Sequence, residues 1–413
     1  MQRAVFEDVR IEGHLIDSGI MSAVMDSIIA MGGEFESLSF EVGRTNDDAS
    51  VAVLRVSADT QSQLDSILAE VQSHGAVACD PSDASLATAT IDGVFPEDFY
   101  STTNMETEVR IAGSWVRVDN PEMDLGVRID PTSRAAETIP MADVRQGDVF
   151  VVGNRGIRVH PHERPRDRQT FEFMSSAVSS EKPKAQVVAE VARMLRETRA
   201  AGRDVIAVAG PAVIHTGAAQ HLARLVELGF ISVLFGGNAI ATHDIESALY
   251  GTSLGVGLSD GVPWLGGHEH HLRAINTIRG CGSIAAAVEQ GVLTKGLMYT
   301  LVKRGVPFVL AGSIRDDGPL PDVITDVIDA QNEMRTYAQN AGACLMLSTM
   351  LHSIATGNML PASTTTVCVD INPAVVTKLA DRGSWQTVGI VTDVGLFLEH
   401  LADELERGES ASV

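Results

Sequence analysis

The chain has 413 residues, 45% of them hydrophobic, and a formal net charge of −23. This length predicts two or three domains with sizeable cores, and the excess of acidic residues excludes nucleic acid and anionic membranes as partners, because both would be repelled. No apolar run approaches the ~20 residues of a spanning helix, and the first residues lack the pattern of a signal peptide. Four widely spaced cysteines predict free thiols in a reducing cytoplasm, namely Cys79, Cys281, Cys344 and Cys368.

Residues 1–80 alternate in a β-α-β-β-α-β rhythm. Strands are expected at 4–11, 34–42, 50–56 and 76–79, and helices at 18–31 and 59–74. Ser18 and Asp59 are candidate caps of the two helices, and Gly32-Gly33 ends the first. The order predicts a ferredoxin-like α+β module, which could bind an amino acid, mediate a dimer or act as a packing domain.

Residues 81–182 contain short β-prone runs between Gly, Pro and Asn turns. The runs are 108–111, 114–118, 126–129, 148–152 and 156–159. Without any helical period, they predict a small β-barrel or sandwich. The segment Phe95–Asn104 (FPEDFYSTTN) gathers aromatic and hydroxyl residues in a loop. It could reach into a neighbouring active site or pack domains together.

Residues 183–413 repeat a strand–loop–helix unit, after a helix at 183–201. The expected strands are 204–209, 231–235, 306–310, 344–347, 366–369 and 387–391. This alternation predicts a doubly wound, Rossmann-like α/β domain with a mostly parallel sheet. Polar, glycine-bearing loops follow the strands, where such a sheet binds a nucleotide and its substrate. The sequence therefore predicts a cofactor enzyme.

Several loop residues are candidates for cofactor binding, although GxGxxG is absent. In the run Gly236–Ala239, small residues would let backbone N–H groups approach a phosphate, or Asn238 could simply cap the next helix. Asp370 ends a strand, and its carboxylate could accept hydrogen bonds from both ribose hydroxyls, which would favour NAD over NADP. Asn372-Pro373 already supplies the following cap. Asp393 could cap a helix or contact the cofactor.

Two other loops concentrate charged residues. The first carries Arg315, Asp316, Asp317 and Asp322, and the second carries His268, Glu269, His270, His271 and Arg273. The second loop lacks the further Cys or HxxxH spacing of a closed zinc site, so no metal is expected. Because histidine titrates near neutrality, substrate binding or proton transfer suits this loop better.

Long motifs make the family recognisable. They are DGVFPEDFYSTTN (92–104), VGNRGIRV (152–159), GGNAIATHDIE (236–246), VPFVLAGSIRDDGPLPDV (306–323) and TMLHSIATGNMLP (349–361). From about residue 5 to residue 403 the chain resembles the archaeal-type ornithine cyclodeaminase family, which is related to lysine-ketoglutarate reductase/saccharopine dehydrogenase. The resemblance implies conversion of L-ornithine to L-proline and ammonia, with NAD as a recycled cofactor. It also implies that NAD is contacted by Asn238, Ala239, Asp316, Thr349, Met350, Leu351, His352, Asp370, Asp393 and Val394.

The implied reaction also needs groups that hold the substrate and move protons. Arg273 and Arg315 are candidates for binding the α-carboxylate. Glu269, Asp317 and His271 are candidates for recognising the amine or taking its proton. We expect a homo-oligomer. Two alternatives remain open, namely another NAD-dependent amino-acid dehydrogenase of the saccharopine or lysine type, and a non-catalytic sensor of NAD and an amino acid.

Overall fold

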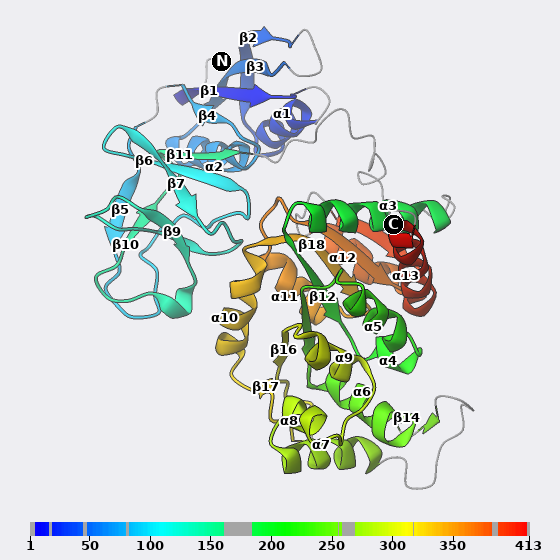
Figure 1. The fold of residues 1–413 in the computed structure, drawn as a ribbon. Helices are drawn as coiled ribbons and strands as arrows, with labels where there is room; N and C mark the ends of the chain where they lie inside the picture. The colour runs from blue at the N-terminus through cyan, green and yellow to red at the C-terminus, as the bar shows by residue number, and fades with distance from the viewer. Residues whose placement is uncertain are drawn as a thin grey trace. The chain divides into compact units, whose positions relative to one another are not determined.

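The structure is a computed structural model that describes residues 5–15, 19–43, 48–79, 82–160, 184–254, 256–257, 269–316, 318–381 and 387–410. The chain divides into two compact units, residues 1–169 and 170–413 (Figure 1), which we describe separately. Among the described residues, no helix combines the length and the apolar character needed to cross a membrane.

The first unit begins with an α+β module. Its elements are β1 (Val5–Gly13), α1 (Ile20–Ala30), β2 (Glu34–Glu41), β3 (Ser50–Ala58), α2 (Gln61–Ser73) and β4 (Val77–Ala78). The sheet has the order β2-β3-β1-β4, and every neighbouring pair is antiparallel. Alternate residues of β3 are buried against the two helices, as the period of a strand requires. The expected ferredoxin-like topology is confirmed.

The caps of these two helices differ from the expected ones. Thr60, not Asp59, caps α2, because its Oγ accepts a hydrogen bond from the Gln63 amide at 3.2 Å. Ser18 lies outside the described residues, and α1 follows Gly19, which has a positive φ of 73°. Gly32 ends α1 as expected, with a φ of 76°.

A curled sheet completes the first unit. Its elements are β5 (Ser85–Thr88), β6 (Glu106–Ile111), β7 (Ser114–Asp119), β8 (Gly126–Ile129), β9 (Ala136–Ile139), the 3-10 helix η1 (Met141–Asp143), β10 (Val149–Val152) and β11 (Ile157–His160). The strand order is β11-β6-β7-β9-β8-β10-β5. Just before β5, the Ala84 amide donates to the Arg110 carbonyl of β6, which brings the two ends of the sheet together. The barrel-like expectation is confirmed.

The aromatic loop packs into this sheet. Phe95 stacks on Phe99 at 4.4 Å between ring centroids and meets Phe150 edge-on at 5.2 Å. Thr102 is buried and its hydroxyl donates to the Glu122 carbonyl at 2.6 Å. These side chains therefore belong to the core of their own unit.

The second unit contains a seven-stranded parallel sheet (Figure 1). Its strands are β12 (Asp204–Ala209), β13 (Val233–Gly237), β16 (Phe308–Ala311), β17 (Val323–Ile324), β18 (Ala341–Leu347), β19 (Thr365–Asp370) and β20 (Thr387–Val391), and β14 (Thr252–Ser253) and β15 (Val256–Gly257) form a separate hairpin. The order β17-β16-β13-β12-β18-β19-β20 is that of a doubly wound dinucleotide-binding fold with one added edge strand. The Rossmann-like expectation is confirmed. The strand expected at 231–235 lies two residues later, because Gly236 and Gly237 pair with Leu310 and Ala311.

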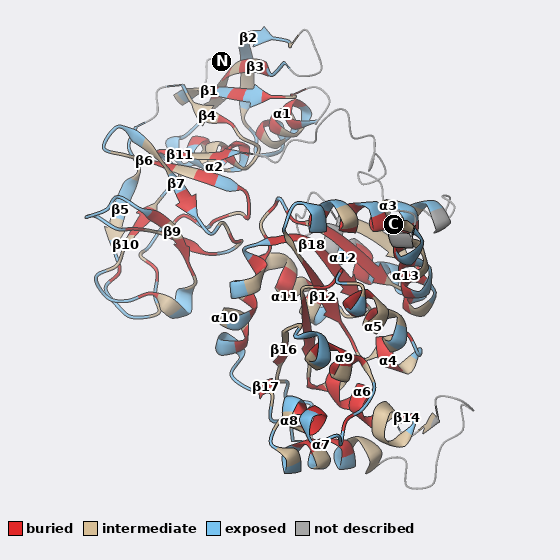
Figure 2. Cartoon of the chain, viewed as in Figure 1, coloured by how far each residue is buried: buried red, intermediate tan, exposed pale blue. Residues whose placement is uncertain are grey.

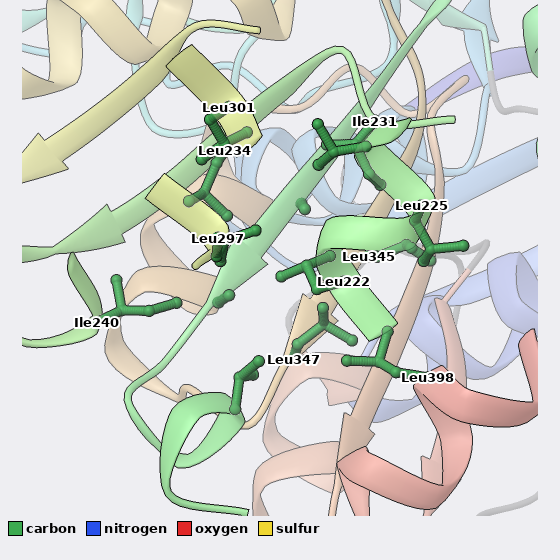
Figure 3. Close-up of a cluster of buried hydrophobic side chains, with 14 of the residues drawn as sticks. Leu222, Leu225, Ile231, Leu234, Ile240, Leu297, Leu301, Leu345, Leu347 and Leu398 are labelled. Carbon is green, nitrogen blue, oxygen red and sulfur yellow. The ribbon is translucent and has the colours of Figure 1, made fainter. Parts of the chain in front are cut away.

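Helices cover both faces of this sheet. They are α3 (Lys184–Ala200), α4 (Ala212–His215), α5 (Ala219–Glu227), α6 (Asn238–Tyr250), α7 (His270–Cys281), α8 (Ile284–Glu289), α9 (Leu297–Arg304), α10 (Val327–Ala338), α11 (Leu351–Met359), α12 (Pro373–Asp381) and α13 (Val394–Ser410). Buried side chains of α10, α11 and α12 pack on one face, and those of α3, α5, α6, α9 and α13 pack on the other. The central strands are buried throughout (Figure 2). Figure 3 shows the larger core, in which Leu345 and Leu347 meet Leu222 and Leu398.

Two cysteines lie in the smaller core. Cys344 and Cys368 are 0% and 1% exposed on neighbouring strands, and the structure holds both as free thiols. Burial raises the pKa of the Cys368 thiol to about 12 and raises that of Cys344 further. Both thiols are therefore protonated at neutral pH and unreactive, as expected.

Candidate functional site

The order of the strands reverses between β12 and β18, and the two strands approach each other closely where they end. The Gly210 amide donates to the Leu347 carbonyl at 3.0 Å. A Cβ at Gly210 would lie 2.4 Å from the Ser348 carbonyl oxygen, so only glycine fits. Ser348 itself has a φ of +49°, a conformation that costs of order 1–3 kcal/mol for such a residue. Strained backbone of this kind concentrates at functional sites.

Expected cofactor residues from different strands meet beside this point. His352, in the first turn of α11, lies against Gly237 at the end of β13, where an added Cβ would be 3.1 Å from the His352 Nε2. Burial lowers the pKa of His352, and the nearby Asp316 carboxylate opposes that shift. Asp316 is held in turn by the Ser313 amide, which donates to its Oδ2 at 2.8 Å. Residues that follow β13, β16 and β18 therefore form one cluster.

Asn238 joins two of these loops and does not cap α6. Its Oδ1 accepts hydrogen bonds from the Leu320 amide at 3.0 Å and from the Thr242 hydroxyl at 3.3 Å. The residue is 5% exposed, and Gly237 occupies the cap position. The capping alternative is therefore wrong. Ala239 follows it in the first turn of α6 and is half-buried.

Asp370 and Asp393 end the next two strands. Asp370 Oδ1 accepts from the Asn372 amide at 2.7 Å, and Asn372 caps α12 through its own Oδ1 to the Ala374 amide at 3.0 Å. Asp370 is thus not needed as the helix cap, as expected. Asp393 does cap its helix, because its Oδ1 accepts from the Leu396 amide at 3.0 Å. Its other oxygen leaves room for a ligand contact as well.

The remaining expected contacts lie on the same edge of the sheet. Thr349, Met350 and Leu351 follow β18, where Met350 is 44% and Leu351 is 75% exposed. Val394 begins α13 and is buried. Ile371, which follows Asp370, is 73% exposed. Exposed apolar side chains beside carboxylates are a surface suited to an aromatic base and a ribose.

These residues fit a dinucleotide. Gly210 and Gly237 allow the strand ends to approach the Ser348 carbonyl and the His352 ring closely, and a Cβ at either position would crowd those neighbours. Asp370 retains acceptor capacity beyond its single hydrogen bond, as two ribose hydroxyls would require. The N-termini of α6, α11 and α13 all begin at this edge, where their dipoles favour a phosphate.

The residues proposed for catalysis are distributed differently. Glu269 and Arg273 form an ion pair at 2.6 Å at the start of α7, with side chains 47% and 62% exposed. His271 is half-buried on the same helix, and its ring lies 6.4 Å from that of His243. Arg315 is exposed in the loop after β16. Asp317 lies outside the described residues.

Asp322, at the end of the charged loop, has a structural role. Its Oδ2 accepts a hydrogen bond from the Ile284 amide at the start of α8, at 2.9 Å. Burial raises the pKa of this carboxyl group, while the hydrogen bond lowers it. The loop is therefore anchored to α8 at this end.

A buried polar network, which sequence reasoning missed, lies where α4, α6, α7 and β14 meet. Glu246 is 0% exposed; its Oε2 pairs with His243 Nδ1 at 2.8 Å, and its Oε1 accepts from the Thr252 hydroxyl at 2.9 Å. The same hydroxyl contacts His270 Nδ1 at 2.8 Å. His215 Nδ1 lies 2.6 Å from the Ser253 hydroxyl.

Two signals for this network were present in the sequence. The spacing His243-x-x-Glu246 places both side chains on one face of a helix, and His215 ends the short helix α4 that follows a buried strand. Neither signal reveals that the rings of His215 and His243 meet, with their centroids 4.8 Å apart. Within the described ranges, no group of three or more His, Cys, Asp or Glu side chains has the arrangement of a metal site.

Family models cover almost the whole chain. Residues 6–105 match the LOR/SDH bifunctional enzyme conserved region, and residues 106–188 match the first C-terminal region of ArgZ-like arginine dihydrolases. Residues 189–401 match the Rossmann-fold C-terminal region of the same proteins.

Named relatives are similar over nearly the whole of this chain. The ornithine cyclodeaminase of Methanothermobacter thermautotrophicus is 53% identical over 97% of this chain and 98% of its own. The bifunctional arginine dihydrolase/ornithine cyclodeaminase AgrE of Nostoc is 49% identical over 97% of this chain, which spans 58% of AgrE.

Solved structures agree. Apo ArgZ, a cyanobacterial arginine dihydrolase, matches with a TM-score of 0.86 at 41% identity, over 98% of this chain and 59% of that one. A LOR/SDH protein of Methanococcus maripaludis matches with a TM-score of 0.74 at 51% identity, over 79% and 99%. The ternary complex of AgrE with ornithine and NAD+ matches with a TM-score of 0.54 at 47% identity, over 98% and 58%.

Proposed function

We propose, for a chain that belongs to the archaeal-type ornithine cyclodeaminase family, that it converts L-ornithine to L-proline and ammonia. The cofactor is NAD, in keeping with the Rossmann-fold region and with a relative solved with both ornithine and NAD+. The observation that carries the proposal is the convergence of Gly237, Asp316 and His352 at the edge where the strand order reverses.

Each part of the site has a distinct task in this reaction. NAD, when bound, supplies a hydride acceptor that can return the same hydride later in the cycle. We assign the ribose to Asp370 and the neighbouring contacts to Asn238, Ala239, Asp316, the run 349–352, Asp393 and Val394. Arg273 and Arg315 are the proposed partners of the α-carboxylate. Glu269, His271 and Asp317 are the proposed partners of the amines.

The chemistry sets what these side chains must do. The α-amine has to be neutral before hydride can leave Cα, and the δ-amine has to be neutral before it can attack that carbon. One nitrogen must then accept a proton to depart as ammonia. The protein therefore has to accept a proton and give one back within a site that holds Cα close to the cofactor.

Replacing Asp370 with alanine should weaken NAD binding. The change removes the proposed ribose acceptor, and a loss of about 1–3 kcal/mol corresponds to a roughly 5- to 150-fold higher Kd. Calorimetric titration with NAD+ measures it. The matched control is Asn372→Ala, which removes the α12 cap from the same turn and should leave the NAD affinity within a few-fold. Equal Kd values for wild type and Asp370→Ala would remove Asp370 from the site.

Ornithine that carries deuterium at Cα should yield proline that retains the label. The hydride removed from Cα is returned to the same carbon if the cofactor is recycled in place. Mass spectrometry of the product measures retention, and absorbance of reduced nicotinamide should not accumulate in proportion to proline. Substoichiometric NAD+ should support many turnovers.

Two other outcomes would point elsewhere. One NADH released for each ornithine consumed would identify a dehydrogenase instead. Tight NAD binding without any product from ornithine would argue for a different amino-acid substrate or for a sensor, and a panel of basic amino acids would then distinguish the two.

A further inference from the structure

The polar network around Glu246 lies beside the proposed cofactor site. Asn238 and His243 both lie on α6, and Thr242, next to His243, donates its hydroxyl to Asn238 Oδ1. His215 lies on α4, which directly follows β12 at the point where the strand order reverses. The network therefore extends from the same strand ends that carry the cofactor contacts.

The geometry fixes how His243 presents its ring. Glu246 is fully buried, and its carboxylate can only accept hydrogen bonds, so His243 must donate from Nδ1 across the 2.8 Å contact. The amide of Leu254 and the hydroxyl of Thr252 hold the same carboxylate in place. A neutral His243 then carries its lone pair on Nε2, which has no hydrogen-bond partner among the described residues. A histidine oriented in this way by a buried carboxylate is arranged as a general base.

Other polar groups surround the His243 ring. The His215 ring lies 4.8 Å from His243, and the pKa of His215 is lowered by burial and by His243, against the opposing effect of Glu246. The ring of His271 on α7 lies 6.4 Å away, and His270 on the same helix reaches Thr252. Among the described residues, the groups that face His243 are histidines and the Glu246 carboxylate.

We propose that His243 accepts the proton that the amino-acid substrate must lose from an amine, with Glu246 as its positioning residue. This rests on the proposed function and names the proton acceptor for it. The N–H bond of the ammonium breaks, an N–H bond forms at Nε2, and the positive charge moves to an imidazolium stabilised by Glu246. The same proton is then available to the nitrogen that leaves as ammonia, so no other reactant is needed.

Glu269 is less suited to this task. Its carboxylate pairs with Arg273 at the exposed start of α7, where both side chains are about half or more exposed. Solvent screens such a pair, and its carboxylate is already engaged by the guanidinium. The ring of His271, on the same helix as Glu269, lies 6.4 Å from that of His243.

The direct test uses the wild-type chain without substrate. Long-range proton–nitrogen NMR of the imidazole rings distinguishes the two neutral tautomers, with His243→Gln to assign the signal. We expect His243 to carry hydrogen on Nδ1 and none on Nε2 at neutral pH. In Glu246→Gln the neutral amide no longer requires a donor, so the population should shift toward Nε2–H. Finding Nε2 protonated in the neutral wild type would overturn the proposal.

Activity supplies the second test. His243→Gln should lower kcat for proline formation by about 10²–10⁴-fold and leave the Kd for NAD+ unchanged. The wild-type kcat should rise with pH on the acid side of its profile, and the variant should lack this rise. Glu246→Gln should lower kcat by at least about tenfold. His400→Gln, an exposed histidine on α13, is the control and should match wild type. Full kcat in a folded His243→Gln would refute the inference, whereas an inactive wild type would refute the proposed function instead.

Discussion

Asp244→Ala should lower the free energy of unfolding of the C-terminal unit by about 3–5 kcal/mol, since it leaves two buried backbone donors unsatisfied. Asp244 is 2% exposed, and its two oxygens accept from the amides of Leu297 and Met298 at 2.9 and 2.8 Å. These amides begin α9, after Gly296, which offers no side chain to cap the helix. Denaturant unfolding, followed through the transition of this unit, measures the loss.

Asp326→Ala is the matched control for this prediction. Asp326 also accepts two backbone amides, those of Ile328 and Asp329 at the start of α10, but it is exposed. Water can replace its hydrogen bonds, so the cost should be only about 1 kcal/mol. Equal losses in the two variants would show that burial adds nothing to the Asp244 cap.

Asp244 should also make the stability of the folded state depend on pH. Burial raises the pKa of Asp244 from 3.8 to about 6, against the hydrogen bonds that lower it. Its protonation therefore stabilises the folded state fully below about pH 4, and this contribution is lost as the pH rises through 6. From pH 4 to 7 the wild type should lose about 2 kcal/mol relative to Asp244→Asn, which cannot titrate. A constant difference between the two would contradict the raised pKa.

Gly210→Ala should damage both folding and cofactor binding. The new methyl group would lie 2.4 Å from the Ser348 carbonyl oxygen and 3.0 Å from the Thr349 Cβ, so the loops after β12 and β18 must separate. Forced overpacking of backbone costs about 2–4 kcal/mol, and displacement of residues 348–352 should raise the Kd for NAD+ at least tenfold. Thermal unfolding and calorimetry measure the two effects.

Gly357→Ala provides the comparison for Gly210. Gly357 lies in α11, and a Cβ there would meet only the Met346 Cε at 3.7 Å, an ordinary contact. Alanine is the better helix former, so this variant should be neutral or slightly more stable. If Gly210→Ala behaved in the same way, the close approach of the two loops would have no role.

Much of the fold could be predicted, because its pattern is local. The strands Asp204–Ala209 and Thr387–Val391 were predicted with the observed bounds, since each is a short apolar run between polar loops. β5 was missed because its residues are mostly exposed, and β9 was missed because its sequence, AETI, contains no apolar run. Thr60 and Asp59 are both good caps by residue type, and only the structure distinguishes them.

The site was predictable only in part. Loops at strand ends can be read from the sequence, and so could Asn238, Asp316 and Asp370 as candidates. Side chains that meet across helices cannot be read in this way. His215 and Ser253 lie on α4 and β14, and their contact depends on how α6 packs between them. The pairing of Glu269 with Arg273 differs, because it joins residues four apart at the start of one helix, a spacing that sequence can indicate.

The reversal of strand order also determines when the sheet can be completed during synthesis. β12 ends at residue 209, yet its second partner, β18, is not complete until residue 347. At ~5–20 residues per second, a ribosome needs about 7–28 s to cover that interval. Throughout that interval one edge of β12, which is apolar after Asp204, has no native partner, and non-local pairing of this kind is slow to form. The strand order that brings the cofactor contacts together therefore also leaves the nascent chain open to misassociation until β18, the fifth strand of this sheet in chain order, has emerged.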